Sequence, residues 1–361
     1  STRKESSAAS DVYKRQNYGI VCKKRGEDLN YIGSKYSLMD FLTATIADVA
    51  GSNVHGKVFA DLFAGTGVVG KTFKEKGYRV ISNDIQYYSY VLNKHYIENV
   101  PPLSAEIAES LNQLAGTEGF IYKNYCAGSG SGRQYFTDEN GMKCDSIRIE
   151  LEQLKKCGEI DESQYYYLLA SLINSIDKYA NTASVYGAFL KKVKKSAAKE
   201  FQLELLPIID GDKESKAYNK NISDIISTIG GDILYLDPPY NARQYCTNYH
   251  VLETIARYDD PQLHGKTGLR DYSSQKSLFC SPRTVVDAFD DVLRQADFKY
   301  IFLSYNNEGL MPFDVIQHTM EKYGEYQRFE QEYRRFKADT DKNRNIKANT
   351  TTEYLHCLIR K

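Results

Sequence analysis

Apolar positions recur at two different spacings along this chain. The segment SKYSLMDFLTATIADVAG at 34–51 carries apolar side chains three and four positions apart and ends on a glycine, which predicts an amphipathic helix. KVFADLF at 57–63 and YRVISNDI at 78–85 are short apolar runs instead, with the helical stretch VVGKTFKEK between them. Two strands that flank a helix form a βαβ unit, so we expect an α/β protein whose parallel sheet begins near Val58.

The pattern changes in the middle of the chain, where apolar residues at helical spacing dominate residues 101–219. Strand-like runs return with DILYLDPPY and KYIFLSYN, and two alternating stretches, EYQRFEQEYRRF and TEYLHCLIRK, predict a C-terminal hairpin. We therefore expect a catalytic domain formed by residues 17–100 and 220–361, interrupted by a mostly helical insert at 101–219. The polar, pattern-free residues 1–16 are expected to be a disordered or non-native lead.

Composition narrows the class of protein further. Of the 361 residues, 42% are hydrophobic and 26% are charged, which is typical of a soluble globular protein. No run approaches the roughly 18 apolar residues of a membrane span, and the first residues have no signal-peptide core, so we expect a cytoplasmic protein with no membrane partner. The seven cysteines form no CxxC pair and the six histidines no zinc-binding spacing, so no metal site is expected.

The segment GTGVVG at 65–70 fits the GxGxxG pattern between a strand and a helix. Asp84 lies at the end of the next strand, where its carboxylate can accept hydrogen bonds from a ribose. This spacing predicts a site for an adenosine cofactor but does not separate NAD from others. Asp61, just before the glycines, disfavours a pyrophosphate and favours a cationic group, which S-adenosylmethionine carries; the alternative is a carboxylate stabilised by nearby helix amides.

The sequence DPPY at 237–240 ends the apolar run DILYL. Two consecutive prolines fix the backbone and remove two hydrogen-bond donors, so the strand cannot continue as a central strand. The Asp237 carboxylate and the Pro238 carbonyl could accept both N–H bonds of a planar amine such as adenine N6, and Tyr240 could stack on a base flipped out of a duplex. The alternative is a purely structural corner, which is less favoured beside the glycine loop.

Three blocks in this order, YIGSK at 31–35, DLFAGTGVVG at 61–70 and DPPY, resemble the N6-adenine DNA methyltransferases of the Dam-like, or D12, class. The resemblance spans most of residues 28–360 and implies a Rossmann-like S-adenosylmethionine-dependent methyltransferase sheet with an inserted helical target-recognition lobe. The stretches RQYFTDENGMKCDSIR and ANTASVYGAFLK resemble the modification methylases that accompany restriction endonucleases more than the GATC maintenance enzymes.

The resemblance also implies roles for individual residues. The catalytic group would be Asp237, Pro238, Pro239 and Tyr240. Contacts to S-adenosylmethionine would come from Tyr31, Lys35, Asp61, Phe63, Gly65, Gly67, Asp84 and Asp237, with Tyr31 and Lys35 at the methionine end and Asp84 at the ribose. Tyr31 departs from the tryptophan often found in the GATC enzymes, although it keeps an aromatic ring.

Duplex DNA would be the partner, yet the 47 basic residues equal the 47 acidic ones, so phosphates must be met by local patches. Candidates are Arg243 beside DPPY, Lys191 and Lys192 in KKVKK, and Arg344 in the loop of the C-terminal hairpin; for the lysines, a solvated surface is an equally good interpretation. A cognate restriction endonuclease in the same system would be a functional partner.

Other functions compete with adenine methylation of DNA. The same motif could serve methyl transfer to RNA or another planar amine, and an NAD-dependent oxidoreductase would use GTGVVG and Asp84 but leave DPPY unexplained. A non-catalytic DNA-binding relic would be expected to have lost part of these motifs. Methylation of cytosine C5 needs a nucleophilic thiolate, and the chain has no Pro-Cys dipeptide to suggest one.

Overall fold

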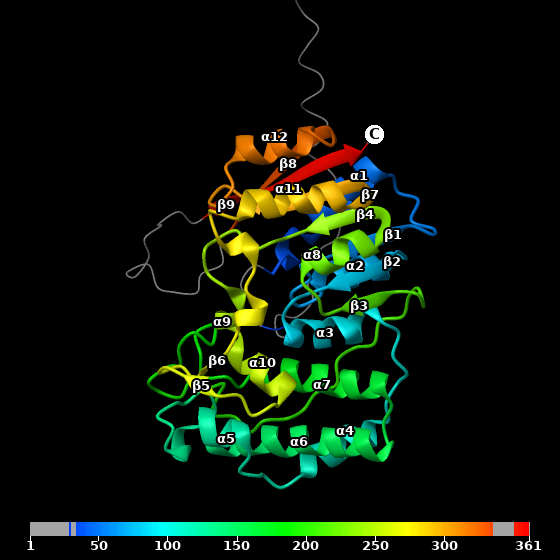
Figure 1. Ribbon diagram of the computed structural model, residues 1–361. Helices are drawn as coiled ribbons and strands as arrows, with labels where there is room; N and C mark the ends of the chain where they lie inside the picture. The colour runs from blue at the N-terminus through cyan, green and yellow to red at the C-terminus, as the bar shows by residue number, and fades with distance from the viewer. Residues whose placement is uncertain (1–28, 30–33, 335–349, 361) are drawn as a thin grey trace, which may run out of the picture.

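A computed structural model describes residue 29, residues 34–334 and residues 350–360. Its centre is a seven-stranded sheet of order β3-β2-β1-β4-β7-β9-β8 (Figure 1). The strands β3, β2, β1, β4 and β7 pair in parallel, and β9 runs antiparallel between β7 and β8. The bounds of the strands are β1 Val58–Asp61, β2 Arg79–Asn83, β3 Lys216–Tyr218, β4 Gly230–Leu236, β7 Asp297–Asn306, β8 Gly324–Arg334 and β9 Thr350–Arg360.

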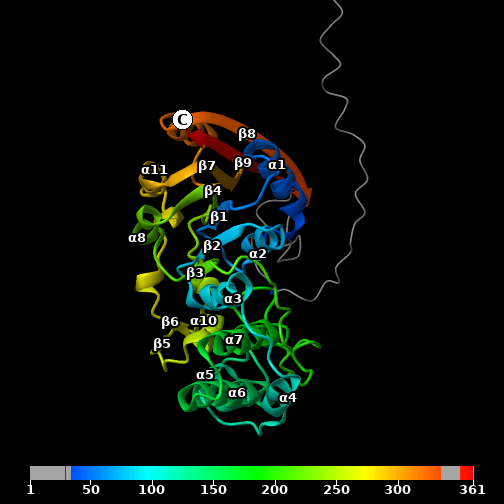
Figure 2. The ribbon, with the colours of Figure 1, turned by 90° about the vertical axis from the view of Figure 1, so that its right-hand side faces the viewer.

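Helices cover both faces of this sheet, because successive side chains of a strand point to opposite faces. In β4, Ile233 and Tyr235 enter one apolar core, and Leu234 and Leu236 enter a second core on the other face. Figure 2 shows the sheet between two helical layers, with α1 and α2 on one side and α8 and α11 on the other. The helices of these layers are α1 Met39–Ala50, α2 Val68–Glu75, α3 Tyr87–Ile97, α8 Ile222–Ile225, α11 Val285–Gln295 and α12 Phe313–Glu321.

A second, mostly helical lobe lies beyond the β3 edge of the sheet, at the bottom of Figure 1. Its helices from the insert are α4 Ala105–Gln113, α5 Phe120–Tyr125, α6 Asp138–Cys157 and α7 Glu162–Asp177. A capping box begins α7, since Asp161 accepts a hydrogen bond from the Gln164 amide while the Gln164 side chain accepts one from the Asp161 amide.

The chain that follows β4 also packs against this lobe. It forms α9 Tyr245–Asn248, α10 His250–Arg257 and a small hairpin of β5 Leu263–His264 and β6 Leu269–Arg270. The fully buried guanidinium of Arg148 in α6 donates a hydrogen bond to the Ile255 carbonyl (2.8 Å), and the Tyr125 hydroxyl donates one to the Gly268 carbonyl (2.9 Å). The lobe is therefore made of segments from both sides of DPPY.

Short 3-10 helices complete the described secondary structure: η1 Tyr36–Leu38, η2 Ala127–Ser129, η3 Ile226–Thr228, η4 Ser273–Gln275 and η5 Leu278–Cys280. The predicted βαβ unit and C-terminal hairpin are both confirmed. The expected insert ended at residue 219, yet β3 at Lys216–Tyr218 already pairs with β2, so the sheet resumes before that boundary. No helix in the described ranges is long and apolar enough to span a membrane.

Candidate active site

Three neighbouring parallel strands end on or next to an acidic residue. Asp61 is the last residue of β1, Asp84 follows β2, and Asp237 follows β4. Because β1 lies between β2 and β4, these carboxylates gather at one edge of the sheet. The chain passes from β1 to β2 on one side and later returns to β4 on the other side. The carboxyl end of β1 is therefore the topological switch point, where open α/β sheets bind ligands.

The glycine loop joins β1 to α2 and is fixed by hydrogen bonds to its backbone. The Gly65 amide donates to Asp84 Oδ2 (2.8 Å), and the buried Asn93 side chain donates to the Gly65 carbonyl (3.0 Å). Gly67 precedes α2 with a φ of +82°, a conformation that disfavours any other residue. A Cβ at Gly67 would lie 3.0 Å from Asn93 Oδ1. The loop thus needs glycine for its backbone conformation and for its close packing.

Replacing Gly67 with alanine is expected to lower the free energy of unfolding by about 2 kcal/mol, because alanine disfavours the left-handed conformation and its Cβ would crowd Asn93. The substitution should also weaken cofactor binding. Asn93 cannot move aside, since its side chain also accepts a hydrogen bond from Ser82 (2.6 Å) and donates one to the Ser89 carbonyl (2.8 Å). Urea unfolding measures the change. Gly56→Ala is the matched control: Gly56 has a φ of +72°, and a Cβ there would have no atom within 4 Å, so equal losses in the two variants would contradict the packing role.

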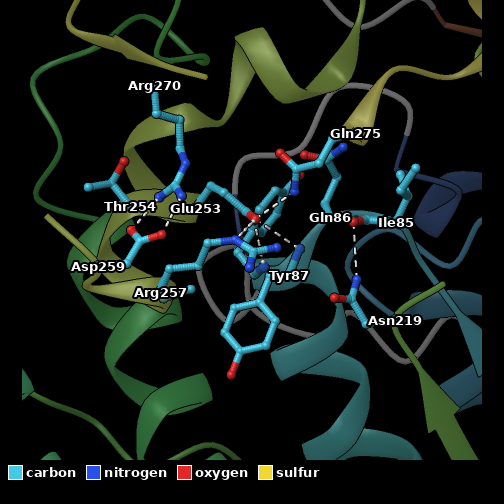
Figure 3. Close-up of polar contacts among 12 residues, drawn as sticks. Ile85, Gln86, Tyr87, Asn219, Glu253, Thr254, Arg257, Asp259, Arg270 and Gln275 are labelled. Atoms are coloured by element: carbon cyan, nitrogen blue, oxygen red, sulfur yellow. Dashed lines mark hydrogen bonds and ion pairs between the residues drawn. The ribbon is translucent and has the colours of Figure 1, made fainter. Parts of the chain in front are cut away.

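Asp84 is held in a turn that faces the pocket. Its Oδ1 accepts a hydrogen bond from the Gln86 amide (2.8 Å), and its carbonyl accepts one from Asn219, just after β3 (2.7 Å). Asn219 also donates to the Ile85 carbonyl (3.1 Å), and Figure 3 shows these two residues side by side. Burial raises the pKa of Asp84 to about 6, although the amides of Gln86 and Gly65 lower it. A ligand that donates hydrogen bonds or carries positive charge would favour its ionised form.

Asp61 is buried close to two other acids, Asp84 and Asp237. Its side chain is 1% exposed, and within the described residues neither carboxylate oxygen accepts a hydrogen bond of good geometry. Burial raises the pKa of Asp61 well above its usual range, Asp237 and Asp84 raise it further, and the amides of Phe63 and Gly70 offset only part of this. A buried carboxylate in this state is stabilised by a cationic ligand, so Asp61 fits the ammonium group of S-adenosylmethionine.

DPPY forms one wall of a pocket that Asp84 also lines. The lining residues are Phe63, Asp84, Ile85, Gln86, Asp237, Pro238, Pro239, Tyr240, Gln244, Tyr245, Gln275 and Ser277. The Tyr240 carbonyl accepts a hydrogen bond from the Leu310 amide (3.0 Å), and its ring meets Tyr305 edge to face. The predicted ribose-binding acid and the predicted catalytic motif therefore share one cavity.

Lys35 contacts Asp237 of the predicted catalytic motif directly. Its Nζ is 3.0 Å from Asp237 Oδ1 and 3.1 Å from Glu353 Oε1, and its side chain is 5% exposed. Burial raises the pKa of Asp237 to about 6, with Lys35 lowering this pKa and Glu353 raising it. The sequence predicted Lys35 as a cofactor residue and gave no indication of Glu353.

Glu253 in α10 is a further site residue that the sequence did not reveal. It is 1% exposed and accepts hydrogen bonds from the amides of Tyr87 (3.2 Å) and Tyr88 (3.0 Å), and from Arg257 (2.6 Å) and Gln275 (2.6 Å). Figure 3 shows it between Gln275 and the start of α3. It thereby joins the turn after Asp84 to the pocket wall at Gln275. An acid inside the apolar run VLETIA was the available signal.

The basic residues predicted to contact DNA do not form one cluster in the described part of the structure. Arg243 is exposed, three residues beyond Tyr240, and Lys191 and Lys192 are exposed on the segment that follows α7. Tyr31 and Arg344 lie outside the described residues. The structure thus places Arg243 beside the pocket and leaves the other basic residues as predictions.

The charges around the pocket and the fold together define a class of protein. Among the described residues, four acids gather here and Lys35 pairs with two of them, Asp237 and Glu353; the other two acids are Asp61 and Asp84. Such a site repels a pyrophosphate and attracts a cationic cofactor. A Rossmann-like sheet with this site at its switch point is that of an S-adenosylmethionine-dependent methyltransferase.

Comparison with known proteins gives the family. Residues 31–319 match the model of the D12 class N6 adenine-specific DNA methyltransferases. The chain is 54% identical to the type II methyltransferase M.NlaIII of Neisseria lactamica, over 91% of this chain and 99% of that protein. It is 34% identical to the type II methyltransferase M.CviAII of Paramecium bursaria Chlorella virus 1, over 91% and 97%. The chain belongs to the D12 class of N6 adenine-specific DNA methyltransferases, and its cofactor is S-adenosylmethionine.

Two further likenesses are partial or distant. The chain is 40% identical to the type II methyltransferase M.FokI of Planomicrobium okeanokoites, over 86% of this chain, and spans about 50% of that protein. Magnesium protoporphyrin IX methyltransferase of Synechocystis is 8% identical, over 90% of this chain and 79% of that one, with a TM-score of 0.33, which is too low to support a conclusion.

The family membership excludes the alternatives of an NAD-dependent oxidoreductase and an RNA methyltransferase.

Proposed function

We propose that this protein is the modification enzyme of a type II restriction-modification system, and that it methylates N6 of an adenine flipped out of a specific duplex sequence. The observation that carries the catalytic assignment is the shared pocket, in which DPPY faces the turn after Asp84. The relatives M.NlaIII and M.CviAII are type II methyltransferases, which supports the biological setting. A cognate restriction endonuclease recognising the same DNA sequence follows from that setting.

The target amine would be oriented by the DPPY backbone and the Asp237 carboxylate. Adenine N6 is a poor nucleophile because its lone pair is delocalised into the ring. Hydrogen bonds from its two N–H groups to Asp237 and to the Pro238 carbonyl would localise that lone pair and stabilise the positive charge that develops on nitrogen. Pro239 keeps this corner rigid, and Tyr240 would stack on the flipped base.

The cofactor would lie along the glycine loop. Asp61 would pair with its ammonium group, Gly65 and Gly67 would allow its close approach, Asp84 would accept hydrogen bonds from its ribose, and Phe63 would contribute apolar contact. Tyr31 and Lys35 are proposed at its methionine end. S-adenosylmethionine supplies an electrophilic methyl group on a sulfonium, and it needs no metal.

The DNA backbone would be held outside the pocket. Arg243 is the first candidate because it is exposed beside DPPY, and Lys191, Lys192 and Arg344 are proposed as further phosphate contacts. Each phosphate that such a residue neutralises would steepen the salt dependence of binding. Residues 101–219 are proposed as the main part of the target-recognition lobe.

The proposal is tested by incubating the protein with labelled S-adenosylmethionine and unmethylated DNA of mixed sequence, then mapping N6-methyladenine by sequencing. We expect methylation at one short sequence motif and none with Asp237→Ala. Protection of that motif from a restriction endonuclease of the same specificity supports the biological setting. Absence of transfer to any DNA, or undiminished transfer by the variant, would contradict the proposal.

A further inference from the structure

Three ionisable side chains from distant parts of the chain form a cluster that includes Asp237, a residue that lines the pocket. Lys35 precedes α1, Asp237 follows β4, and Glu353 lies in β9. The side chain of Glu353 is 1% exposed and that of Lys35 5% exposed, while Asp237 keeps 18% exposure toward the pocket. We infer that Glu353 is a positioning residue for the methyl-transfer reaction: it holds the Lys35 ammonium so that one oxygen of Asp237 stays available to the target amine. This inference rests on the catalytic role proposed for Asp237.

The hydrogen-bond geometry supports this role. Lys35 contacts Oδ1 of Asp237, and in the described part of the chain Oδ2 of Asp237 accepts no hydrogen bond. The same Lys35 ammonium is 3.1 Å from Oε1 of Glu353, and the Ser304 hydroxyl of β7 donates to that oxygen at 2.5 Å. A lysine ammonium is a point charge on a flexible stem, so a single partner would not fix its position. Glu353, itself fixed by Ser304, supplies the second contact.

Sheet pairing explains why a residue so near the end of the chain reaches the site. β9 lies beside β7, which lies beside β4, and Glu353 is paired in register with Asn306 at the end of β7. DPPY follows the neighbouring end of β4. Glu353 also lies beyond residue 319, where the match to the family model ends. Its place in the site is thus a property of the assembled sheet.

Charge coupling gives a measurable signature. Burial lowers the pKa of Lys35, but Asp237 and Glu353 raise it well above its usual range, so the lysine stays charged. Asp237 faces Lys35 and Glu353. The other titratable groups near it are Tyr235 and Tyr240 from its own segment, Tyr245 of α9 and Asp61 of β1. Removing the negative charge of Glu353 therefore favours the ionised form of Asp237, and removing the positive charge of Lys35 disfavours it.

The test compares Glu353→Gln with the wild type and with Glu330→Gln, an exposed carboxylate on the adjoining strand β8. In Glu353→Gln we expect kcat to fall about tenfold near neutral pH, because Lys35 can shift onto both oxygens of Asp237. We also expect the acidic limb of the kcat profile to move to lower pH, whereas Lys35→Met moves it to higher pH. Glu330→Gln changes neither quantity.

Two further measurements keep the result decisive. Carboxyl NMR titration of the protein without cofactor should report the same directions for the pKa of Asp237. Glu353→Asp retains the negative charge, but its shorter side chain does not reach Lys35. This variant should therefore lower kcat without moving the acidic limb of the pH profile to lower pH. Thermal unfolding checks that each variant is folded. The inference is overturned if Glu353→Gln keeps the wild-type kcat and the acidic limb of its pH profile does not move. If Glu353→Gln does not fold, a wild-type kcat in Glu353→Asp overturns it instead. Activity retained by Asp237→Asn instead refutes the catalytic role on which it rests.

Discussion

Replacing Asp237 with asparagine is expected to lower kcat by on the order of 10²- to 10³-fold. The two side chains have the same shape, but asparagine lacks the charge that stabilises a positive nitrogen, and its amide group offers donors where the adenine amine needs an acceptor. Lys35 also loses one of its two carboxylate partners, so its buried ammonium remains paired with Glu353 alone among these two. Single-turnover methylation of a duplex that contains the recognition sequence measures the effect directly.

The control for this prediction separates chemistry from binding and folding. Asp48→Asn, at an exposed position of α1, should keep the wild-type rate. Calorimetry measures the cofactor affinity of Asp237→Asn, so that any loss of the cofactor contact predicted for Asp237 is separated from the loss of rate at saturating cofactor. The thermal unfolding of the variant should remain cooperative. If the single-turnover rate of Asp237→Asn equals that of Asp48→Asn, the amine is activated by some other group.

Replacing Asp61 with asparagine is expected to have opposite effects on binding and on stability. The buried carboxylate is the proposed partner of the cofactor ammonium, so its loss should weaken S-adenosylmethionine binding by about 3 kcal/mol, or on the order of 10²-fold. Without ligand, the same carboxylate is buried beside other acids and lacks a hydrogen bond of good geometry among the described residues. Removing its charge should therefore stabilise the cofactor-free protein.

The sign of the stability effect depends on pH. The pKa of Asp61 is raised in the folded state, so folding favours its protonated form, and the wild type loses stability as pH rises above the unfolded pKa of about 4. The melting temperature of Asp61→Asn should thus exceed that of the wild type by more at pH 7 than at pH 4. Thermal unfolding at several pH values and calorimetric titration with S-adenosylmethionine measure the two effects. Unchanged affinity together with a lower melting temperature at pH 7 would contradict this assignment.

The sequence by itself determined the glycine turn after β1 and the end of the strand at DPPY, and it predicted their roles in cofactor binding and catalysis. Glycines 65 and 67 indicate a turn that needs their conformational freedom, and Asp84 follows at a spacing set by the length of one helix and one strand. DPPY marks the end of a strand because two prolines cannot continue one. These signals are local, since each depends on what neighbouring residues allow the backbone to do.

The boundaries of the lobe depended on tertiary packing. The predicted insert stopped before DPPY, yet α10 and the β5–β6 hairpin join the same lobe from the other side of that motif. Periodicity indicates that α10 buries one face, but it does not say against which element. Glu253 illustrates the consequence, because its partners on α3 and at Gln275 are distant in sequence.

Lys35 and Glu353 show most clearly what only the tertiary structure decided. The motif YIGSK identified Lys35 by resemblance, and alternation identified the strand that carries Glu353, but neither pattern indicated that the two residues share Asp237. The order β4-β7-β9 within one sheet brings Glu353 close to the end of the strand that precedes Asp237, and Lys35 reaches the same carboxylate from the segment before α1. Local sequence therefore determined the chemistry available at each strand end, and long-range strand pairing decided which charges surround it.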